Sequence, residues 1–260
     1  MFAYQDTDES VDVAFTDRHG GISPGAFRSL DLSTRDPDRV DEVEENIDLL
    51  AYAMARGHED AAAPFSLPTG VRVPSVVLMH QVHGADVTVV DQELLGQRGR
   101  GPDPVADALV TTLPGVMLLV RVADCVPVLL ADPVAGVVGA AHAGRPGLVA
   151  GIVPRAVEAM RELGACRLRA WVGPHVCGAC YEVPERMRAD VTAAVPESFA
   201  ETSWGTPSVD IGAGVMAQLA AAGVETVDAS RCTMEHGELY SYRRQGEESG
   251  RLGGLVWVRP

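Results

Sequence analysis

Three apolar runs between residues 116 and 141 constrain the fold of this chain most strongly. Val116–Val122, Val126–Ala131 and Val137–Ala141 consist mainly of β-branched and small aliphatic residues, with Arg121 as one interruption. Pro, Asp and Gly stand at their boundaries. Runs of this composition and length are typical of buried strands. The sequence therefore predicts that these segments form strands in the core.

Polar residues stand where these runs end. Asp124 and Cys125 separate the first two runs, His142 follows the third, and His80 and His83 follow another apolar run upstream. A buried Asp is rare without a partner. A thiol and an imidazole at strand ends suit a metal site or a nucleophile–base pair.

His83, Cys125 and His142 match the ligand set of a catalytic zinc site, in which three nitrogen or sulfur ligands leave a fourth position open. Their spacings of 42 and 17 residues are too long for a zinc-finger module. On the residues alone, the alternative is a buried structural cysteine with two hydrogen-bonded histidines. Both interpretations stay open at this point.

Composition excludes several classes of partner. The chain has 260 residues, a net charge of −15 and a pI near 4.8. So acidic a surface argues against binding nucleic acid or anionic membranes. No apolar stretch is long enough to span a bilayer, and the acidic N-terminus does not resemble a signal peptide. We therefore expect a cytoplasmic protein, with five cysteines that do not form disulfides.

The remaining pattern predicts a single α/β domain over residues 1–260, with residues 1–10 disordered. Val40–Met54 has apolar residues at helical spacing and acidic residues in its first turns. A second helix is predicted over Leu148–Gly164, and its N-terminus beside His142 would favour an anion. Further helices are predicted at Pro184–Val195 and Val215–Gly223, and further strands at Val11–Phe15, Leu168–Val172, Val224–Val227 and Leu255–Val258.

Two other groups of residues stand out. Cys177 and Cys180 form a C-x₂-C pair, but it lacks both the second pair of a zinc knuckle and a thioredoxin-like context. We expect a structural or incidental role for it. Arg243, Arg244 and Arg251 cluster near the end of an acidic chain, where they could pair with surface acids or hold a phosphate. Dinucleotide and P-loop motifs are absent from the sequence.

Ordered motifs extend along nearly the whole chain. They are Arg18-x-Gly20-Gly21-x-Ser23, Ser29-Leu30-Asp31-Leu32, Glu44-Glu45-Asn46, Gln81-Val82-His83-Gly84, Ala106-Asp107-Ala108, Ala123-Asp124-Cys125-x-Pro127, His142-Ala143-Gly144, Gly173-Pro174, Cys180-Tyr181-Glu182-Val183, Arg231-Cys232-Thr233 and Ser241-Tyr242-Arg243-Arg244. Through them the chain resembles the YfiH-like family, long labelled multicopper polyphenol oxidase or laccase-domain proteins. Members of that family have been reassigned as zinc-dependent purine nucleoside phosphorylases with adenosine deaminase activity.

The resemblance implies a fold, a metal site and substrates. The fold would be an α/β (α+β) sandwich of four layers, α-β-β-α, with mixed sheets, shared with toxin-like cysteine hydrolases. The ligands would be His83, Cys125 and His142, which bind zinc rather than copper, whereas His80 matches no fixed family position. The partners would be purine nucleosides and phosphate, and no obligate protein partner is evident.

The chain departs from the family pattern next to the proposed ligands. The usual H-A-G-W-R-G is here His142-Ala143-Gly144-Arg145-Pro146-Gly147, so Arg145 would have to replace a guanidinium from the neighbouring position. Asp31 replaces an Asn. Candidate phosphate-binding residues are Arg18, Arg145 and the Arg243–Arg244 pair. Asp124 and Asp107 are candidates for the proton-shuttling carboxylate of a deaminase, although Asp124 is better placed to support the site from behind.

Three alternative functions can be weighed against the same residues. A copper phenol oxidase would need more ligands than seven histidines, several of them in loops, can supply. A cysteine hydrolase would use Cys125 as the nucleophile and His142 as the base, without metal. A non-catalytic binding or cell-wall quality-control protein would need neither a metal nor a catalytic nucleophile.

Overall fold

Two facing β-sheets form the centre of the protein. The computed structural model describes residues 1–33, 39–56, 74–97 and 101–260. The five-stranded sheet has the order β1 (Phe2–Asp8), β2 (Val11–Thr16), β13 (Leu252–Val258), β6 (Val116–Val122), β3 (Ser75–Val77). The six-stranded sheet has the order β12 (Glu225–Asp228), β9 (Arg169–Val172), β7 (Val126–Asp132), β8 (Val137–Ala143), β5 (Ala108–Thr111), β4 (Val87–Val89). Both sheets are mixed, because β3–β6, β9–β12 and β4–β5 pair in parallel and the other pairs are antiparallel.

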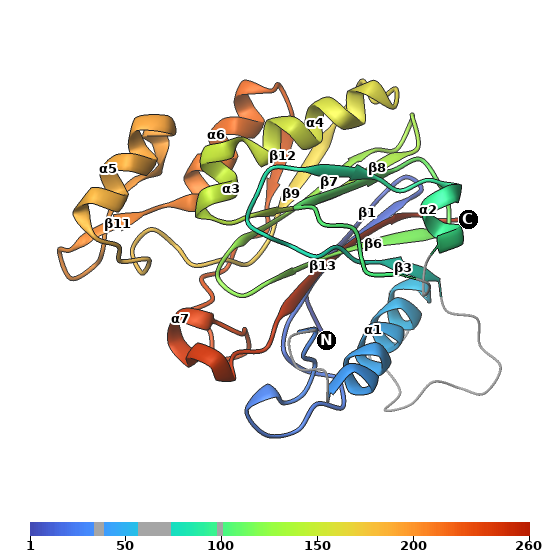
Figure 1. Ribbon diagram of the computed structural model, residues 1–260, viewed down its shortest axis with the longest axis horizontal. Helices are drawn as coiled ribbons and strands as arrows, with labels where there is room; N and C mark the ends of the chain where they lie inside the picture. The colour runs from blue at the N-terminus through green and yellow to red at the C-terminus, as the bar shows by residue number, and fades with distance from the viewer. Residues whose placement is uncertain (34–38, 57–73, 98–100) are drawn as a thin grey trace.

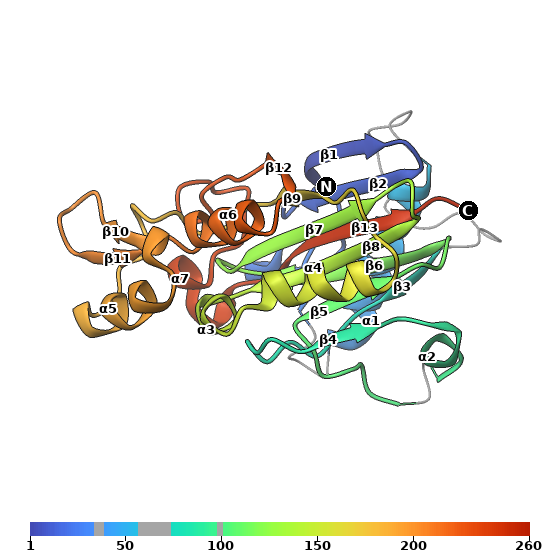
Figure 2. The ribbon, with the colours of Figure 1, turned by 90° about the horizontal axis from the view of Figure 1, so that it is seen from above.

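Helices cover the two outer faces (Figures 1 and 2). Helix α1 (Val40–Ala55) packs on the five-stranded sheet, whereas α4 (Ile152–Glu162) and α6 (Ile211–Ala221) pack on the six-stranded sheet. The result is the four-layer α-β-β-α sandwich expected from the sequence. None of the described helices is long and apolar enough to cross a membrane.

The remaining elements are short and lie at the periphery. They are α2 (Gln92–Gln97), α3 (Arg145–Ala150), α5 (Glu185–Ala194), α7 (Tyr242–Gln245), the hairpin strands β10 (Phe199–Glu201) and β11 (Pro207–Val209), and 3-10 turns at Gly25–Phe27, Pro196–Ser198 and Gly246–Glu248. Of these, α3 and α7 lie closest in the chain to residues of the site described below.

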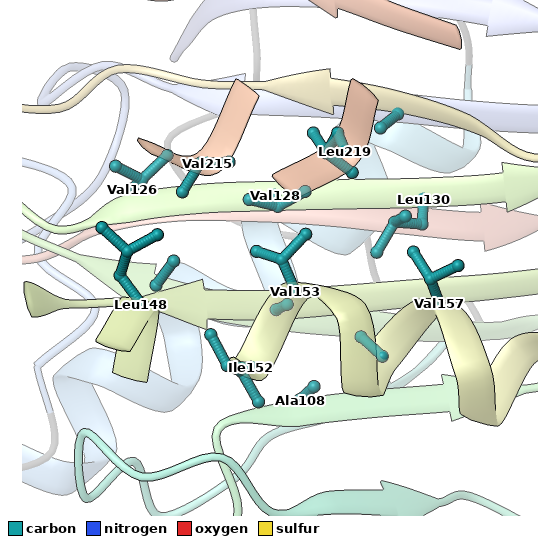
Figure 3. Packing of buried hydrophobic residues seen from close by; sticks show 14 of the residues in the cluster. Ala108, Val126, Val128, Leu130, Leu148, Ile152, Val153, Val157, Val215 and Leu219 are labelled. Atoms are coloured by element: carbon teal, nitrogen blue, oxygen red, sulfur yellow. The ribbon is translucent and has the colours of Figure 1, made fainter. Parts of the chain in front are cut away.

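Burial on both faces explains the apolar runs of the sequence. Along β7, Val126, Val128 and Leu130 contact the helix layer of α4 and α6 (Figure 3), while Leu129 and Ala131 face the other sheet. Successive strand residues point to opposite faces, so a strand between two apolar layers needs an apolar residue at every position. Burying each large side chain stabilises the fold by about 1.5–3 kcal/mol.

Two sequence predictions are wrong in detail. Residues 2–8, expected to be disordered, form β1, which pairs antiparallel with β2. The aspartates of β1 interrupt the apolar pattern that would have predicted a strand. One of them, Asp6, accepts a hydrogen bond from Trp171 Nε1 at 2.8 Å. The helix predicted over Leu148–Gly164 is broken in two at Gly151, whose φ of +80° is left-handed and favours glycine.

Candidate metal centre and cavity

Three chain segments meet at one end of the sandwich because of the sheet topology. The chain leaves β3 and β6 of the five-stranded sheet and crosses to β4 and β7 of the six-stranded sheet. Since β3 and β6 are parallel, both crossings lie at the same end. The first crossing carries His83, the second carries Cys125, and His142 lies at the end of β8, opposite the start of β7.

His83, Cys125 and His142 bring one potential ligand atom each into a cluster in which all three atoms lie within 4.8 Å of one another. Cys125 Sγ lies 3.7 Å from His83 Nε2. Ordinary Zn–S and Zn–N bond lengths place tetrahedral sulfur and nitrogen ligands about 3.6 Å apart. Two imidazoles and a thiolate are also a ligand set that zinc takes. The cluster therefore fits a zinc ion.

Asp107 holds two of the three side chains in place. Its buried carboxylate accepts hydrogen bonds from the backbone N–H groups of Val82, His83 and Gly84 and from His142 Nδ1 at 2.8 Å. The bond to Nδ1 leaves Nε2 of His142 for a metal, an arrangement found in many carboxylate–histidine–zinc sites. Because the Asp107 carboxylate already accepts these four hydrogen bonds, it is suited to position the proposed ligands and poorly suited to shuttle protons.

The charges of these groups depend on one another. Burial alone would raise the pKa of the Cys125 thiol, but the His142 and His83 imidazoles outweigh burial and lower the pKa to about 6. Burial alone would lower the pKa of His142, but Cys125 and Asp107 outweigh it and raise the pKa to about 9. Burial also opposes ionisation of Asp107, yet His142 and the backbone N–H groups hold its pKa below the usual range. Without metal, the site therefore favours a thiolate next to an imidazolium.

Backbone geometry at the site is unusual. His83 has a φ of +60° and Asp124, which precedes Cys125, has a φ of +81°. Non-glycine residues with positive φ cost energy and persist where the surrounding contacts fix them. Gly144 packs against the cluster so closely that a Cβ there would lie 2.6 Å from His83 Cδ2 and 3.2 Å from Cys125 Sγ. Only glycine fits this position without displacing a ligand.

The cluster opens into a cavity of about 770 Å³, a size that suits a small-molecule site. Its described lining residues are Ser33, His80, Gln81, His83, Arg121, Val122, Ala123, Asp124, Cys125, His142, Val176, Tyr181, Ile211, Tyr242, Arg243 and Arg251. Three arginines and one aspartate are therefore among the described lining residues. The local charge is positive although the whole chain carries −15.

The structure separates the predicted anion-binding residues. Arg243 lines the cavity, its Cζ lies over the Tyr181 ring at 4.6 Å from the centroid, and its Nη1 donates to the Glu182 carbonyl oxygen. Arg18 and Arg145 are not among the described lining residues, and Arg18 donates to backbone oxygens of its own loop. Arg244 likewise donates to the carbonyl oxygens of four residues: Thr233, Met234, His236 and Leu239.

Asp124 lines the cavity, but both of its carboxylate oxygens are engaged. Oδ1 accepts from Thr233 Oγ1 and Oδ2 from the Arg243 backbone N–H, each at 2.6 Å. Its backbone carbonyl accepts from the Val176 N–H at 3.0 Å. Its orientation comes from the left-handed loop between β6 and β7, not from strand alternation. Asp124 therefore ties the Cys125 loop to the C-terminal segment.

Sequence reasoning missed part of the cavity wall. Arg121 interrupts an apolar run of the sequence, yet it is a lining residue of the cavity, and its Nη2 donates to the Met79 carbonyl oxygen at 2.8 Å. Burial lowers the pKa of Arg121. Tyr181 and Tyr242 were also missed as lining residues. The one available signal was a cation within a buried strand, which needs a functional or structural reason.

A family model described as multi-copper polyphenol oxidoreductase laccase matches residues 12–259, nearly the whole chain. The chain belongs to this family. The expected YfiH-like, laccase-domain membership is thereby confirmed, and His83, Cys125 and His142 lie within the matched range.

Curated members of the laccase-type family carry names of nucleoside-processing enzymes. A purine nucleoside phosphorylase of Streptomyces griseus is 51% identical over 253 residues, covering 96% of this chain and 95% of that protein. A purine nucleoside phosphorylase of Streptomyces coelicolor is 48% identical over 261 residues, covering 99% of this chain and 100% of that protein. An adenosine deaminase, RL5, from an unknown prokaryotic organism is 34% identical over 216 residues, covering 74% and 78%.

Solved structures of YfiH-like proteins share the fold. YlmD of Geobacillus stearothermophilus superposes with a TM-score of 0.80 at 31% identity and covers 97% of this chain and 93% of that chain. YfiH of Bacillus licheniformis superposes with a TM-score of 0.80 at 25% identity and covers 96% and 93%. These values agree with the mixed-sheet sandwich described above.

Proposed function

We propose that this protein is a zinc-dependent purine nucleoside phosphorylase that converts a purine nucleoside and phosphate into the free base and ribose 1-phosphate. The observation that carries the proposal is the pairing of the three-residue cluster with a cavity lined by Arg121, Arg243 and Arg251. The names of the Streptomyces relatives support the same reaction.

His83, Cys125 and His142 are the proposed zinc ligands. When bound there, zinc would supply a positive Lewis-acidic charge beside the reacting groups. Asp107 orients His142 and fixes the backbone of residues 82–84, so the ligands would be held before metal arrives. Zinc suits this set better than several copper ions, because the other described cluster of candidate ligands contains three cysteines and a glutamate but no histidine.

The charge balance of the cavity favours phosphorolysis over deamination. Guanidinium groups bind phosphate with charge-assisted, often bidentate hydrogen bonds. Arg243 is held on the Tyr181 ring, and Arg251 lies over Tyr242 at 5.7 Å and donates to the Ser249 and Gly250 carbonyl oxygens. Such anchoring lowers the entropy lost when phosphate binds. Deamination calls for a proton-shuttling carboxylate, and both Asp107 and Asp124 are occupied by hydrogen bonds.

In the proposed reaction a phosphate oxygen forms a bond to C1′ of the ribose while the bond from C1′ to the purine nitrogen breaks. The electron pair leaves with the purine, which then takes up a proton. The arginines would place the phosphate and balance its charge, and the cavity of about 770 Å³ has room for both reactants.

A metal-independent cysteine hydrolase is the second candidate. The lowered pKa of Cys125 and the raised pKa of His142 describe the thiolate–imidazolium pair of such enzymes. Removing metal separates the two functions, because a hydrolase of this kind keeps its activity when a chelator strips the protein.

The test incubates zinc-loaded protein with adenosine and, separately, with inosine, each with and without phosphate, and identifies the products by chromatography. Phosphorolysis predicts adenine only when phosphate is present, and its loss on chelation. Inosine formed without phosphate would show deamination instead. Turnover of no purine nucleoside would contradict the proposal.

A further inference from the structure

A second cluster of metal-ligand side chains lies outside the proposed active centre. Cys177, Cys180, Cys232 and Glu235 each bring one potential ligand atom into a group in which all four atoms lie within 4.8 Å of one another. Cys180 and Cys232 are buried, Cys177 is half-buried, and Glu235 is exposed. The C-x₂-C pair of the sequence thus has partners 52 residues or more further along the chain.

Each pair of ligands comes from a tight turn. In the first, the N–H groups of Cys180 and Tyr181 donate to the Cys177 carbonyl oxygen, both at 3.0 Å. In the second, the N–H groups of Glu235 and His236 donate to the Cys232 carbonyl oxygen at 3.3 and 3.2 Å. Both turns place ligands three residues apart, the spacing with which structural zinc sites take paired ligands from one turn.

Backbone hydrogen bonds set the two turns side by side. The His175 N–H donates to the Arg231 carbonyl oxygen at 3.1 Å, and the Thr233 N–H donates to the His175 carbonyl oxygen at 3.0 Å. This short parallel bridge pairs His175 with Cys232. The side chains therefore converge because the backbone is fixed, and not through chance rotamers on a mobile surface.

We propose that Cys177, Cys180, Cys232 and Glu235 bind a second zinc ion with a structural role. Thiolates are preferred zinc ligands, and closed four-ligand sites rich in cysteine are typical of structural zinc. Ordinary Zn–S bonds place sulfur atoms about 3.8 Å apart, so the four atoms need to close by only about 1 Å. A disulfide would use two of the sulfurs and would leave the third sulfur and the carboxylate without a role.

The ion would brace the wall of the catalytic cavity. Tyr181, which carries the Arg243 guanidinium, follows Cys180 directly. Thr233, which follows Cys232, donates to Asp124 in the loop of Cys125. Fixing the two turns together therefore fixes one wall of the cavity relative to the proposed ligand Cys125. This second site does not depend on the proposed reaction, since it would bind zinc whatever the cavity converts.

Metal stoichiometry tests the proposal. The protein is purified under reducing conditions, passed through a desalting column and analysed for zinc by mass spectrometry. The wild-type chain should hold two equivalents. Cys125→Ser should lose the ion of the active centre and keep one, and Cys232→Ser should lose the second ion and keep one. Cys166→Ser changes an exposed cysteine outside both clusters and should keep two.

Cys125→Ser keeps the test decisive even if Cys232→Ser does not fold. Two imidazoles without the thiolate should not hold zinc through desalting, so zinc that this variant retains in one equivalent lies outside the active centre. A single equivalent in the wild-type protein, with none in Cys125→Ser, would overturn the second site. A thiol titration gives a second way to overturn the site. If the unfolded, non-reduced wild-type chain in chelator has only three reactive thiols, a disulfide occupies the cluster.

Glu235 is tested separately in competition with a zinc chelator, using Cys125→Ser so that only the second site is observed. Glu235→Gln should weaken zinc binding by about tenfold or more. The matched control is Glu238→Gln, which should leave zinc binding unchanged. Glu238 is an exposed neighbour of the cluster and pairs with Arg231 at 3.1 Å. Equal binding by the two variants would overturn Glu235 as the fourth ligand.

Discussion

Among single residues, Asp107 connects the proposed metal ligands His83 and His142 to each other. It accepts four hydrogen bonds within the segment of His83 and from His142, so one buried carboxylate orients two proposed ligands. Groups that orient metal ligands commonly change metal affinity by 10–100-fold when they are replaced.

Replacing Asp107 with Asn should therefore weaken zinc binding at the active centre by about 10–100-fold, measured by chelator competition in a Cys232→Ser background. Asp132→Asn is the matched control. Asp132 is also a buried carboxylate that accepts backbone N–H groups, here from Val134, Ala135, Cys166 and Arg167, but it is not part of the cluster. Equal zinc affinity in the two variants would show that Asp107 does not support a metal ligand.

Zinc affinity at the active centre should also depend on pH. The pKa of Cys125 is about 6 and that of His142 about 9 without metal, so between these values the thiol has already lost its proton and His142 has not. Zinc must displace that proton, and affinity should rise by about tenfold per pH unit from pH 6.5 to 8.5. An affinity that stays constant across this window, after correction for the chelator, would contradict the assignment of His142.

At the scale of elements, the start of α3 sets the space around the ligands. Gly144 precedes α3 with a φ of −78°, a backbone conformation that alanine adopts without strain. The constraint at Gly144 is therefore steric, because a Cβ would collide with His83 Cδ2 at 2.6 Å.

Gly144→Ala should leave the fold intact but displace the His83 ring and lower zinc affinity by about tenfold or more, since metal sites tolerate displacements of only about 0.5 Å. Gly96→Ala, in α2, adds the same methyl group where no atom other than those of the adjoining residues and the helix backbone lies within 4 Å, and it should bind zinc like the wild type. Comparing thermal unfolding and zinc content of the two variants separates a steric effect from a loss of stability.

The segment that follows Tyr240 places Arg243, the proposed phosphate-binding arginine, at the cavity. Arg243, at the start of α7, lines the cavity, whereas Arg145, at the start of α3, is not among its described lining residues. Pro146 stands where the family resemblance implies an arginine, so the proposed phosphate contact falls on the C-terminal segment.

Arg243→Ala should raise the KM for phosphate by about tenfold or more, because a hydrogen bond to a charged group contributes about 1.5–3 kcal/mol. Arg145→Ala should change it less than about twofold. Steady-state kinetics at varied phosphate and saturating inosine measures both. A larger effect at Arg145 would return the phosphate site to the start of α3.

Elements with a regular apolar pattern could be predicted from the sequence, whereas contacts between distant segments could not. β6, β7 and β8 were evident because both of their faces are apolar, and α1 because one of its faces is. β1 was missed because acidic residues interrupt its pattern. Gly151 was not recognised as a break between helices, since a glycine within a helical pattern does not reveal its φ.

At the scale of the whole molecule, an acidic chain encloses a cavity whose described lining is basic. Motifs suggested the three proposed ligands, because their residue types carry the chemistry. The choice among the arginines depends on tertiary packing, which placed Arg121 in the cavity and left Arg18 bound to its own loop. The partners of Cys177 and Cys180 were likewise hidden by more than 50 residues of intervening chain.

The central claim is that phosphate is the nucleophile in a cavity built around the three-ligand centre. It is tested most directly by ³¹P nuclear magnetic resonance of zinc-loaded protein with inosine and phosphate, alongside Cys125→Ser. Ribose 1-phosphate should appear in equal amount to hypoxanthine with the wild-type protein, and neither should appear with the variant. Hypoxanthine released without a new phosphate ester, or equal turnover by Cys125→Ser, would contradict it.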